Sequence, residues 1–220
     1  MSSASTLEAE LPLSLHLRAA TRVAHERAET SGFVESLMRG ELTVAAYADL
    51  AAQHHVIYTA LEAAEPFVRS DPAGATMVVE GLRRVPSIER DLETLVGPGW
   101  RDEVRVLPAT ERYAARLREV AGTWVGGYVA HAYTRYLGDL SGGLAVKAIL
   151  QRAYAVPDEA VNFYTFTSIP KPKLFKDDYR ARMDALPFDR EERLAVAAEA
   201  EVAFGLNTAL FAELGAIHLR

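Results

Sequence analysis

Apolar residues recur at three- and four-residue intervals along most of the chain, which is the spacing of one face of an α-helix. The first run starts near Leu13 and is expected to end at residues 31–32, where Ser-Gly favours a helix stop. A second run begins after Thr43, whose hydroxyl suits an N-cap, and ends near Pro66. Its apolar stripe includes His54 and Tyr58. The first third of the chain is therefore predicted to be helical.

The remainder of the chain continues this pattern. We expect further helices over about 74–85, 88–96, 109–121, 123–155, 174–186 and 190–214. Asp189 and Glu192 have the spacing of a capping box at the start of the last helix, and Gly215 is expected to end it. Residues 161–169 are the only strand-like stretch and are too short to build a sheet. The pattern predicts one all-α domain over residues 11–220, after a tail of residues 1–10.

Composition narrows the class of protein. With 220 residues, half of them hydrophobic, the chain can bury roughly 70% of the surface it would expose unfolded. It has no cysteine, which excludes a cysteine nucleophile, an iron–sulfur cluster and thiolate-bound zinc or haem. The lack of cysteine also fits a cytoplasmic protein. The net charge of −6, without a basic block, makes nucleic acid an unexpected partner. The N-terminus lacks a signal-peptide pattern and no 18-residue apolar stretch is apparent, so we expect no membrane partner.

The most informative segment is a glycine-rich part of the run 123–155. Gly138, Gly142 and Gly143 lie within six residues, and each costs a helix about 0.8–1 kcal/mol relative to alanine. Gly138 and Gly142 are one helical turn apart and form a flat patch beside Asp139. A flat ligand could lie against that patch, or another helix could cross closely there; the spacing leaves both open. Arg135 precedes Asp139 by four residues, an order that hints at a partly buried polar network.

A second candidate is the pair His25 and Glu29, which are one turn apart on the first predicted helix. A carboxylate in that position can accept a hydrogen bond from one imidazole nitrogen while the other binds a metal. The alternative is an ordinary pair of surface side chains, and the spacing alone does not exclude it.

Both segments resemble those of one family. Residues 136–143 (Tyr-Leu-Gly-Asp-Leu-Ser-Gly-Gly) are similar to the distal-helix signature of the haem oxygenases. Residues 24–29 (Ala-His-Glu-Arg-Ala-Glu) are similar to their proximal-helix motif, about 110 residues earlier as in that family, and the resemblance extends over about residues 11–215. It implies a single multi-helix domain in which haem is sandwiched between a proximal and a distal helix.

The resemblance also assigns roles around the haem iron. It implies that His25 is the axial ligand and Glu29 its hydrogen-bond partner. Gly138, Gly142 and Gly143 become the distal backbone over the haem, and Asp139 organises distal water. Further members of the network around that aspartate are Arg135, Tyr58 and Asn207.

Other matches concern the rim of the haem. The resemblance implies propionate partners at Arg18, Tyr133, Lys176 and Arg180. At two positions the chain departs from the family, because many relatives have lysine in place of Arg18 and glutamine in place of Leu144. Pocket-lining roles are expected for Phe166 and Phe204.

The implied activity is oxidative cleavage of haem b, both substrate and cofactor, to biliverdin, CO and ferrous iron. It needs O2 and an external electron donor, a ferredoxin or a flavoprotein reductase, because the chain has no nucleotide-binding glycine motif. A competing function is that of a non-catalytic haem carrier or sensor on the same fold. The presence of Arg135, Asp139 and the three glycines argues against it. A thiaminase-like enzyme, which commonly uses a cysteine, and a purely structural helical bundle also compete with it.

Overall fold

The computed structural model describes residues 11–219, and within them it contains helices and no strand. The predicted all-α fold is confirmed, whereas the predicted tail of residues 1–10 lies outside the described residues. The α-helices are α2 (Leu13–Glu29), α3 (Gly32–Arg39), α4 (Val44–Glu62), α5 (Glu65–Ser70), α6 (Val85–Leu95), α7 (Trp100–Glu103), α8 (Pro108–Val120), α9 (Val125–Ala132), α10 (Gly138–Tyr154), α11 (Pro172–Asp184) and α12 (Arg190–His218). Shorter elements are the 3-10 turns η1 (Gly74–Met77), η2 (Glu80–Leu82), η4 (Asp158–Ala160) and η5 (Asn162–Tyr164), and the π-helical turn η3 (Tyr133–Leu137).

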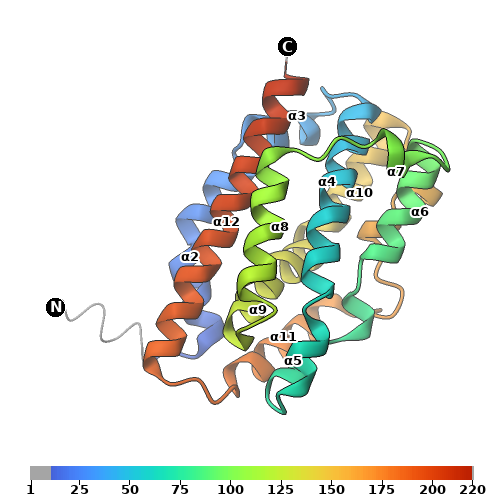
Figure 1. The fold of residues 1–220 in the computed structure, drawn as a ribbon. Coiled ribbons are helices and arrows are strands. Elements are labelled where there is room, and N and C mark those ends of the chain that lie inside the picture. The colour runs from blue at the N-terminus through green and yellow to red at the C-terminus, as the bar shows by residue number, and fades with distance from the viewer. Residues whose placement is uncertain (1–10, 220) are drawn as a thin grey trace.

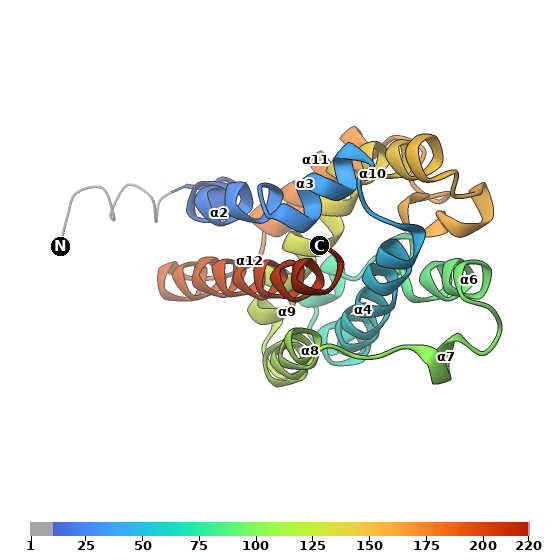
Figure 2. The same cartoon turned by 90° about the horizontal axis from the view of Figure 1, so that it is seen from above.

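The two ends of the described chain form one wall of the molecule, since α2 and α12 lie side by side (Figures 1 and 2). They run parallel. At their starts the Arg193 guanidinium donates to the Leu11 carbonyl over 3.2 Å, and beyond the end of α2 the rings of Phe33 and Phe211 stack with centroids 6.5 Å apart. On the other side of α12 lie α8 and α9, followed by α4 and then α6.

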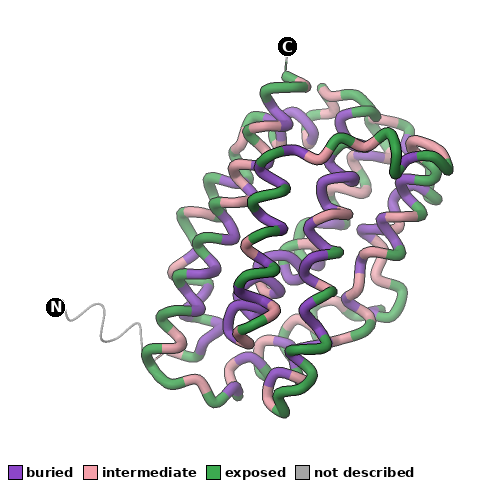
Figure 3. The backbone as a smooth tube through the Cα atoms, viewed as in Figure 1, coloured by how far each residue is buried: buried purple, intermediate pink, exposed green. Residues whose placement is uncertain are grey.

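Buried side chains fill the space between these helices. Figure 3 shows the buried stretches where helices face one another and the exposed stretches on the outer surface. The core is rich in tyrosine, and its fully buried rings are Tyr47, Tyr58, Tyr113, Tyr128, Tyr136 and Tyr179. Because buried phenols need hydrogen-bond partners, several of these tyrosines have polar contacts inside the fold.

The predicted N-cap at Thr43 is confirmed, and of the predicted capping box the bond to the Asp189 carboxylate is present among the described residues. The Thr43 hydroxyl accepts a hydrogen bond from the Ala46 amide at the start of α4, and the Asp189 carboxylate accepts one from the Glu192 amide at the start of α12. The Glu192 carboxylate accepts a bond from the Trp124 indole, which ties the start of α12 to the segment before α9.

Three predicted elements differ in the structure. The stretch 161–169 forms no strand, because its amides at Asn162 and Phe163 donate to the Asp91 carboxylate of α6 rather than to a ladder. The run 74–85 is divided into η1 and η2 instead of one α-helix. Gly215 does not end α12, which continues to His218.

Helix α3 was not predicted. Its apolar side chains Phe33 and Leu37 are buried, and Gly40, at a φ of +75°, ends it in the left-handed conformation that glycine adopts most easily. The helix has only eight residues, too few for a clear period in the sequence.

The longest helix corrects one expectation from sequence. Within the described residues, α12 is long and apolar enough to cross a membrane by length and composition, with a mean hydropathy of 1.4 over its most apolar 18-residue window. The expectation that no such stretch exists is therefore wrong. In the fold, 44% of that window is buried, where α12 packs against α2, α8 and α9. A core helix of a bundle meets the same criterion.

Candidate functional site

The glycine-rich run is one bent succession of α9, the π-turn η3 and α10. A π-turn inserts one extra residue into a helix and is frequent at functional sites. Here it contains Arg135 and brings Gly138 to the start of α10.

The glycines of this run fall into two groups. A Cβ at Gly126 would lie 2.6 Å from the Trp124 ring, so this glycine serves close packing. At Gly138 and Gly142 an added Cβ would meet no atom within 4 Å. A close helix crossing is therefore wrong for these two residues, which face open space. A Cβ at Gly143 would lie 3.0 Å from the Tyr164 ring, so this glycine packs closely against Tyr164, although it also lines the inner cavity.

The space beside Gly138 and Gly142 consists of two adjoining cavities between α2 and α10, which we call the interhelical cleft. The inner cavity has a volume of about 400 Å³ and the outer one about 630 Å³. Both are lined by His25, Glu29, Thr134, Gly138, Gly142 and Phe204. The inner cavity is mostly apolar, with walls from α3, α4, α10 and α12.

His25 and Glu29 lie on the opposite wall of the cleft from the glycines, as their spacing on α2 requires. The His25 Nδ1 atom is 3.3 Å from a Glu29 carboxylate oxygen, and both side chains are at least half exposed. The edge of the Phe204 ring contacts the imidazole, with ring centroids 5.5 Å apart. The contact to Glu29 engages Nδ1 and leaves Nε2 as the nitrogen that can bind a metal.

Behind the glycines, four polar residues from three parts of the chain form what we call the Asp139 cluster: Tyr58, Arg135, Asp139 and Asn207. The Tyr58 hydroxyl donates to the Asp139 carboxylate. The Arg135 guanidinium donates to the Tyr58 oxygen over 3.2 Å and to the Asn207 side-chain oxygen over 2.7 Å. The expected network around Asp139 is thus brought together in the fold.

Burial sets the protonation behaviour of this cluster. Loss of hydration raises the pKa of Asp139, against the opposing effects of the Arg135 charge and the Tyr58 hydrogen bond. Burial likewise raises the pKa of Tyr58 well above its ordinary value. Asp139 therefore holds a proton at higher pH than a free aspartic acid does.

The outer end of the cleft is basic. Arg18, Tyr133 and Arg180 line it, from α2, η3 and α11 respectively. Lys176, one turn before Arg180, does not line it directly; its ammonium donates to the Ser141 hydroxyl over 2.9 Å, and Ser141 does line it. The four expected rim residues therefore gather around one end of the cleft.

Of the two phenylalanines expected to line the pocket, one does and the other does not. Phe204 lines both cavities, as expected. Phe166 lies away from the cleft, and its ring packs under the Arg84 guanidinium at 3.9 Å. The expectation for Phe166 was wrong because the segment 161–169 turns back onto α6. Leu144, the second expected departure from the family pattern, is an exposed side chain on α10.

The structure adds cleft residues that sequence reasoning missed. Those on α3, which was not predicted, are Val34, Leu37 and Met38. From α4 and α12, His54 and Phe211 also line the inner cavity. The only sequence signal for His54 was its place four residues before Tyr58 on one stripe of α4.

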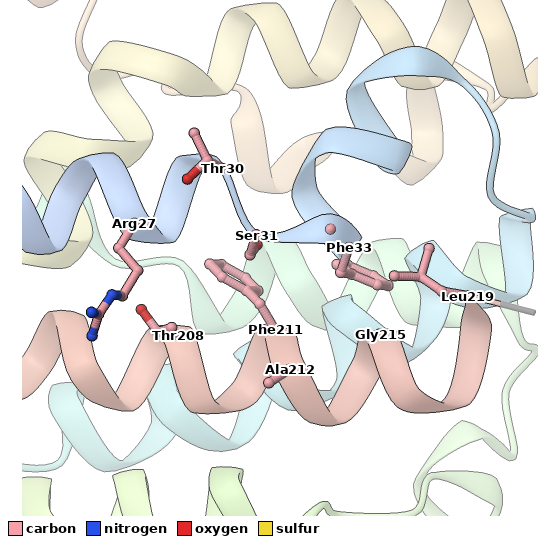
Figure 4. A pocket seen from close by; sticks show the side chains of 10 residues that line it. Arg27, Thr30, Ser31, Phe33, Thr208, Phe211, Ala212, Gly215 and Leu219 are labelled. Atoms are coloured by element: carbon pink, nitrogen blue, oxygen red, sulfur yellow. The ribbon is translucent and has the colours of Figure 1, made fainter.

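A third hollow of about 400 Å³ adjoins the cleft where α2, α3 and α12 meet (Figure 4). Its floor is the pair of stacked rings from Phe33 and Phe211, and Arg27 and Thr208 flank one end. Phe211 lines this hollow as well as the inner cavity, so its ring separates the two.

A second buried cluster ties α12, which lines the cleft, to α8 and α9. The Glu199 carboxylate of α12 accepts hydrogen bonds from Arg116 of α8, at 2.5 and 3.0 Å, and contacts the buried His131 Nε2 of α9 at 3.0 Å. Burial alone would raise the pKa of Glu199, but the hydrogen bonds from His131 and Arg116 outweigh it and lower the pKa to about 2.

This cluster predicts acid sensitivity. Because the folded-state pKa of Glu199 lies below the ordinary value of 4.5, its stabilisation is present above that value and is lost as the pH falls toward 2. We expect Glu199→Gln to lower the free energy of unfolding at pH 7 by about 3 kcal/mol. It should also flatten the pH dependence between 4.5 and 2. Urea unfolding at several pH values measures both, with the less buried Glu213→Gln as control; equal slopes for Glu199→Gln and wild type would contradict the assignment.

Comparison with known proteins shows which family has this fold and these motifs. The heme oxygenase family model matches residues 11–213. Heme oxygenase 1 of Rattus norvegicus is 42% identical over 208 residues, which cover 93% of this chain and 72% of that protein. Heme oxygenase 1 of Synechocystis sp. is 37% identical over 202 residues, which cover 92% and 84%.

Solved structures agree with the sequence relatives. The crystal structure of heme oxygenase-1 from Synechocystis, determined in complex with heme, has a TM-score of 0.89 and 37% identity, covering 93% of this chain and 92% of that one. Heme oxygenase from Leptospira interrogans has a TM-score of 0.88 and 31% identity, covering 92% and 100%. With its helical fold, its histidine facing a glycine patch and these relatives over nearly its whole length, the chain belongs to the heme oxygenase family.

Proposed function

We propose that the protein is a haem oxygenase that binds haem in the interhelical cleft and opens it to biliverdin, with release of CO and iron. The observation that supports this most directly is the opposition of the His25 imidazole to the bare backbone at Gly138 and Gly142, with Asp139 beside it. Membership of the family supports the same reaction.

The residues of the cleft fit haem on three counts. An imidazole nitrogen is available on one wall, and the opposite wall leaves open space where any side chain would project. The two cavities have the size of ordinary cofactor sites, about 300–1,000 Å³. Arg18 and Arg180 at the outer end supply positive charge for two carboxylates. A mostly apolar cavity that adjoins a basic one matches a flat, apolar ring that has two propionates on one edge.

On the His25 side, the protein sets the ligand and its tautomer. The Glu29 carboxylate can accept a hydrogen bond from the Nδ1–H of His25, which selects the tautomer whose Nε2 is free to bind iron. Bound haem supplies the redox-active iron that reacts with O2 and electrons, and also the ring carbon that is oxidised. The Phe204 ring holds the imidazole plane from the side.

On the glycine side, the protein sets access and proton supply. With only backbone at Gly138 and Gly142, no side-chain acid stands directly over the reacting face. Asp139 lines the inner cavity from behind this backbone and is the acid from which protons reach the cleft through water. Arg135 and Tyr58 fix its orientation, and Asn207 fixes Arg135.

The rim residues orient the substrate in its plane. We assign Arg18, Tyr133 and Arg180 to the propionates, and Lys176 to the same edge through its bond to Ser141. Electrons come from a separate ferredoxin or flavoprotein reductase. Cytoplasmic location is the expectation that fits a cysteine-free chain.

Because Gly142 faces open space, we predict that side chains at this position stabilise the haem-free protein or weaken haem binding according to their size. Gly142→Ala should stabilise the protein without haem by about 0.5–1 kcal/mol, because alanine favours a helix and its methyl group meets no neighbour. Gly142→Leu should raise the Kd for haem at least about tenfold by filling the cleft, a loss of about 1.4 kcal/mol. Thermal denaturation and Soret titration measure the two effects.

The control for this prediction is Gly205 on α12, which also faces open space but lines neither cavity. Gly205→Ala should stabilise to a similar extent, and Gly205→Leu should leave haem affinity as in wild type. Normal haem affinity in Gly142→Leu would place the substrate elsewhere.

Aerobic incubation of the haem complex with a reductant tests the proposed reaction. A haem oxygenase loses its Soret band while biliverdin and CO appear in equal amounts. A carrier or sensor keeps the Soret band through repeated cycles of reduction and oxygenation, and that result would replace the proposed function by haem storage.

A further inference from the structure

Two buried charged residues take no part in the roles assigned so far. Asp91 on α6 is 0% exposed, and Arg84, directly before that helix, is 5% exposed. Within the described part of the chain, their side chains bind polar groups of other segments instead of forming an ion pair. Burying a charge in this way is unfavourable unless its hydrogen bonds are made, so both residues depend on the backbone that they bind.

The hydrogen bonds of these two residues meet at Phe163. The Asp91 carboxylate accepts from the Phe163 amide over 2.8 Å, and from the amide and the side chain of Asn162 over 2.7 and 2.9 Å. The Arg84 guanidinium donates to the Phe163 carbonyl over 3.2 Å and to the Thr165 carbonyl over 3.3 Å. Both backbone groups of Phe163 are thus held by buried charges, and we call Arg84 and Asp91 the α6 clamp.

The Phe163 ring packs edge-on against the Tyr58 ring, with centroids 5.4 Å apart and an interplanar angle of 71°. The rings of His54 and Tyr164 enclose it on other sides, at 5.3 and 4.8 Å. Phe163 is buried and lines neither cavity of the interhelical cleft. It therefore affects the cleft only through the side chains that it contacts, and its fixed backbone restricts how the Tyr58 ring can tilt.

The tilt of the Tyr58 ring decides where its hydroxyl points, because the phenol oxygen lies in the plane of the ring. This hydroxyl donates to the Asp139 carboxylate and accepts from the Arg135 guanidinium over 3.2 Å. Hydrogen bonds weaken when their angles are distorted. A contact that fixes the ring of Tyr58 therefore also fixes the hydrogen bond that holds Asp139.

We propose that Phe163, held by the α6 clamp, is a positioning residue that sets the direction of the Tyr58 hydroxyl and, through it, the orientation of the Asp139 carboxylate. For its effect on haem oxidation this inference rests on the proposed function. The hydrogen bond that Phe163 controls, however, belongs to the protein without haem, so it can be tested there.

The acidity of Asp139 in the haem-free protein is the first test. The hydrogen bond from Tyr58 favours the charged carboxylate and lowers the pKa of Asp139, as do the charges of Arg135 and Arg84. Tyr58→Phe removes this bond and Phe163→Leu should misalign it, so both should raise the pKa of Asp139. We expect Phe163→Leu to make Asp139 a weaker acid by about threefold to tenfold, the effect of most of one hydrogen bond. Carboxyl NMR of labelled Asp139 against pH measures the change.

The double variant decides whether Phe163 acts through the Tyr58 hydroxyl. When Tyr58→Phe is already present, adding Phe163→Leu should leave the pKa of Asp139 unchanged. The rate of biliverdin formation should follow the same rule, with a loss of about threefold to tenfold from Phe163→Leu alone and none in the Tyr58→Phe background. The haem Kd should stay within about twofold of wild type. Effects of the two substitutions that simply add would overturn the proposal.

Two further variants separate the clamp from general loosening of α6. Asp91→Ala frees the Phe163 amide and should raise the pKa of Asp139 as Phe163→Leu does, again without effect when Tyr58→Phe is present. Leu92→Ala empties the neighbouring buried position, which is outside the clamp. It should lower the melting temperature but leave the pKa of Asp139 and the rate as in wild type. An equal rise of that pKa in Leu92→Ala would contradict the role of Phe163.

The outcomes for this inference and for the proposed function are distinct. If the wild-type protein does not turn over haem, the proposed function falls, while the pKa of Asp139 still decides whether Phe163 positions Tyr58. If turnover is normal and the pKa effects add, only the present inference falls. Should Phe163→Leu fail to fold, Phe163→Met, which fills the space with a flexible side chain and no ring, takes its place in the same comparisons.

Discussion

Replacing His25 by alanine is expected to abolish imidazole ligation of the haem iron and to reduce turnover at least about 100-fold. The reason is geometric. His25 is placed on the wall opposite Gly138 and Gly142, and its Nδ1 contact with Glu29 leaves Nε2 directed to the cleft. The other cleft histidine, His54, is buried on the far wall and has no carboxylate contact of this kind.

Optical and paramagnetic spectra of the ferric haem complex measure the loss of ligation. Added imidazole should enter the space left by His25→Ala and restore part of the wild-type spectrum and rate. His218→Ala, which removes an imidazole bonded to Asp49 at the end of α12, is the control and should behave as wild type. A wild-type spectrum in His25→Ala would rule out the ligand assignment.

Replacing Asp139 by alanine is expected to reduce biliverdin formation about 100-fold while haem still binds through His25. Asp139 is the partly buried acid beside the glycine backbone, and loss of hydration raises its pKa above the ordinary value. Removing it also leaves the Arg135 charge without its nearest carboxylate, although Asn207 still accepts from that guanidinium.

The variant Asp139→Asn separates shape from proton transfer. It keeps the side-chain size and an oxygen that accepts from Tyr58, but it cannot give up a proton. We expect Asp139→Asn to bind haem as wild type and to be impaired nearly as much as Asp139→Ala. Single-turnover rates with saturating haem measure this, and an active Asp139→Asn would show that Asp139 positions water rather than supplying protons.

The relation of His25 to Glu29 could be predicted from sequence because helical spacing fixes which side chains share a face. The same spacing brought Arg135 and Asp139 together, although their contact runs through Tyr58 and not through a direct ion pair. What spacing could not decide was the purpose of Gly138 and Gly142. A close crossing and an open cleft both require small residues, and only the surroundings of each Cα distinguish them.

Other features depend on contacts between distant segments and therefore escaped the sequence. The walls from α3 were missed because eight residues show too little periodicity, and the π-turn η3 depends on packing of its neighbours. The segment 161–169 has strand-like side chains, but the Asp91 carboxylate captures its amides. Phe163 looked like one position of that strand, and only its ring contact with Tyr58 distinguishes it.

The parallel pair α2 and α12 explains how these parts are held in register. α2 bears His25, whereas α12 bears Phe204 against that imidazole and Asn207 against Arg135. The Glu199 cluster anchors α12 to α8 and α9, and α9 leads directly into η3. One helix thus sets both walls of the cleft relative to each other.

The most direct test of the whole account is a crystal structure of the protein with one equivalent of ferric haem. We predict an iron bonded to the His25 Nε2, the opposite face of the ring against the backbone of Gly138 and Gly142, and propionates directed to Arg18 and Arg180. Haem bound outside the interhelical cleft, or in the cleft with iron bonded to another residue, would contradict the account.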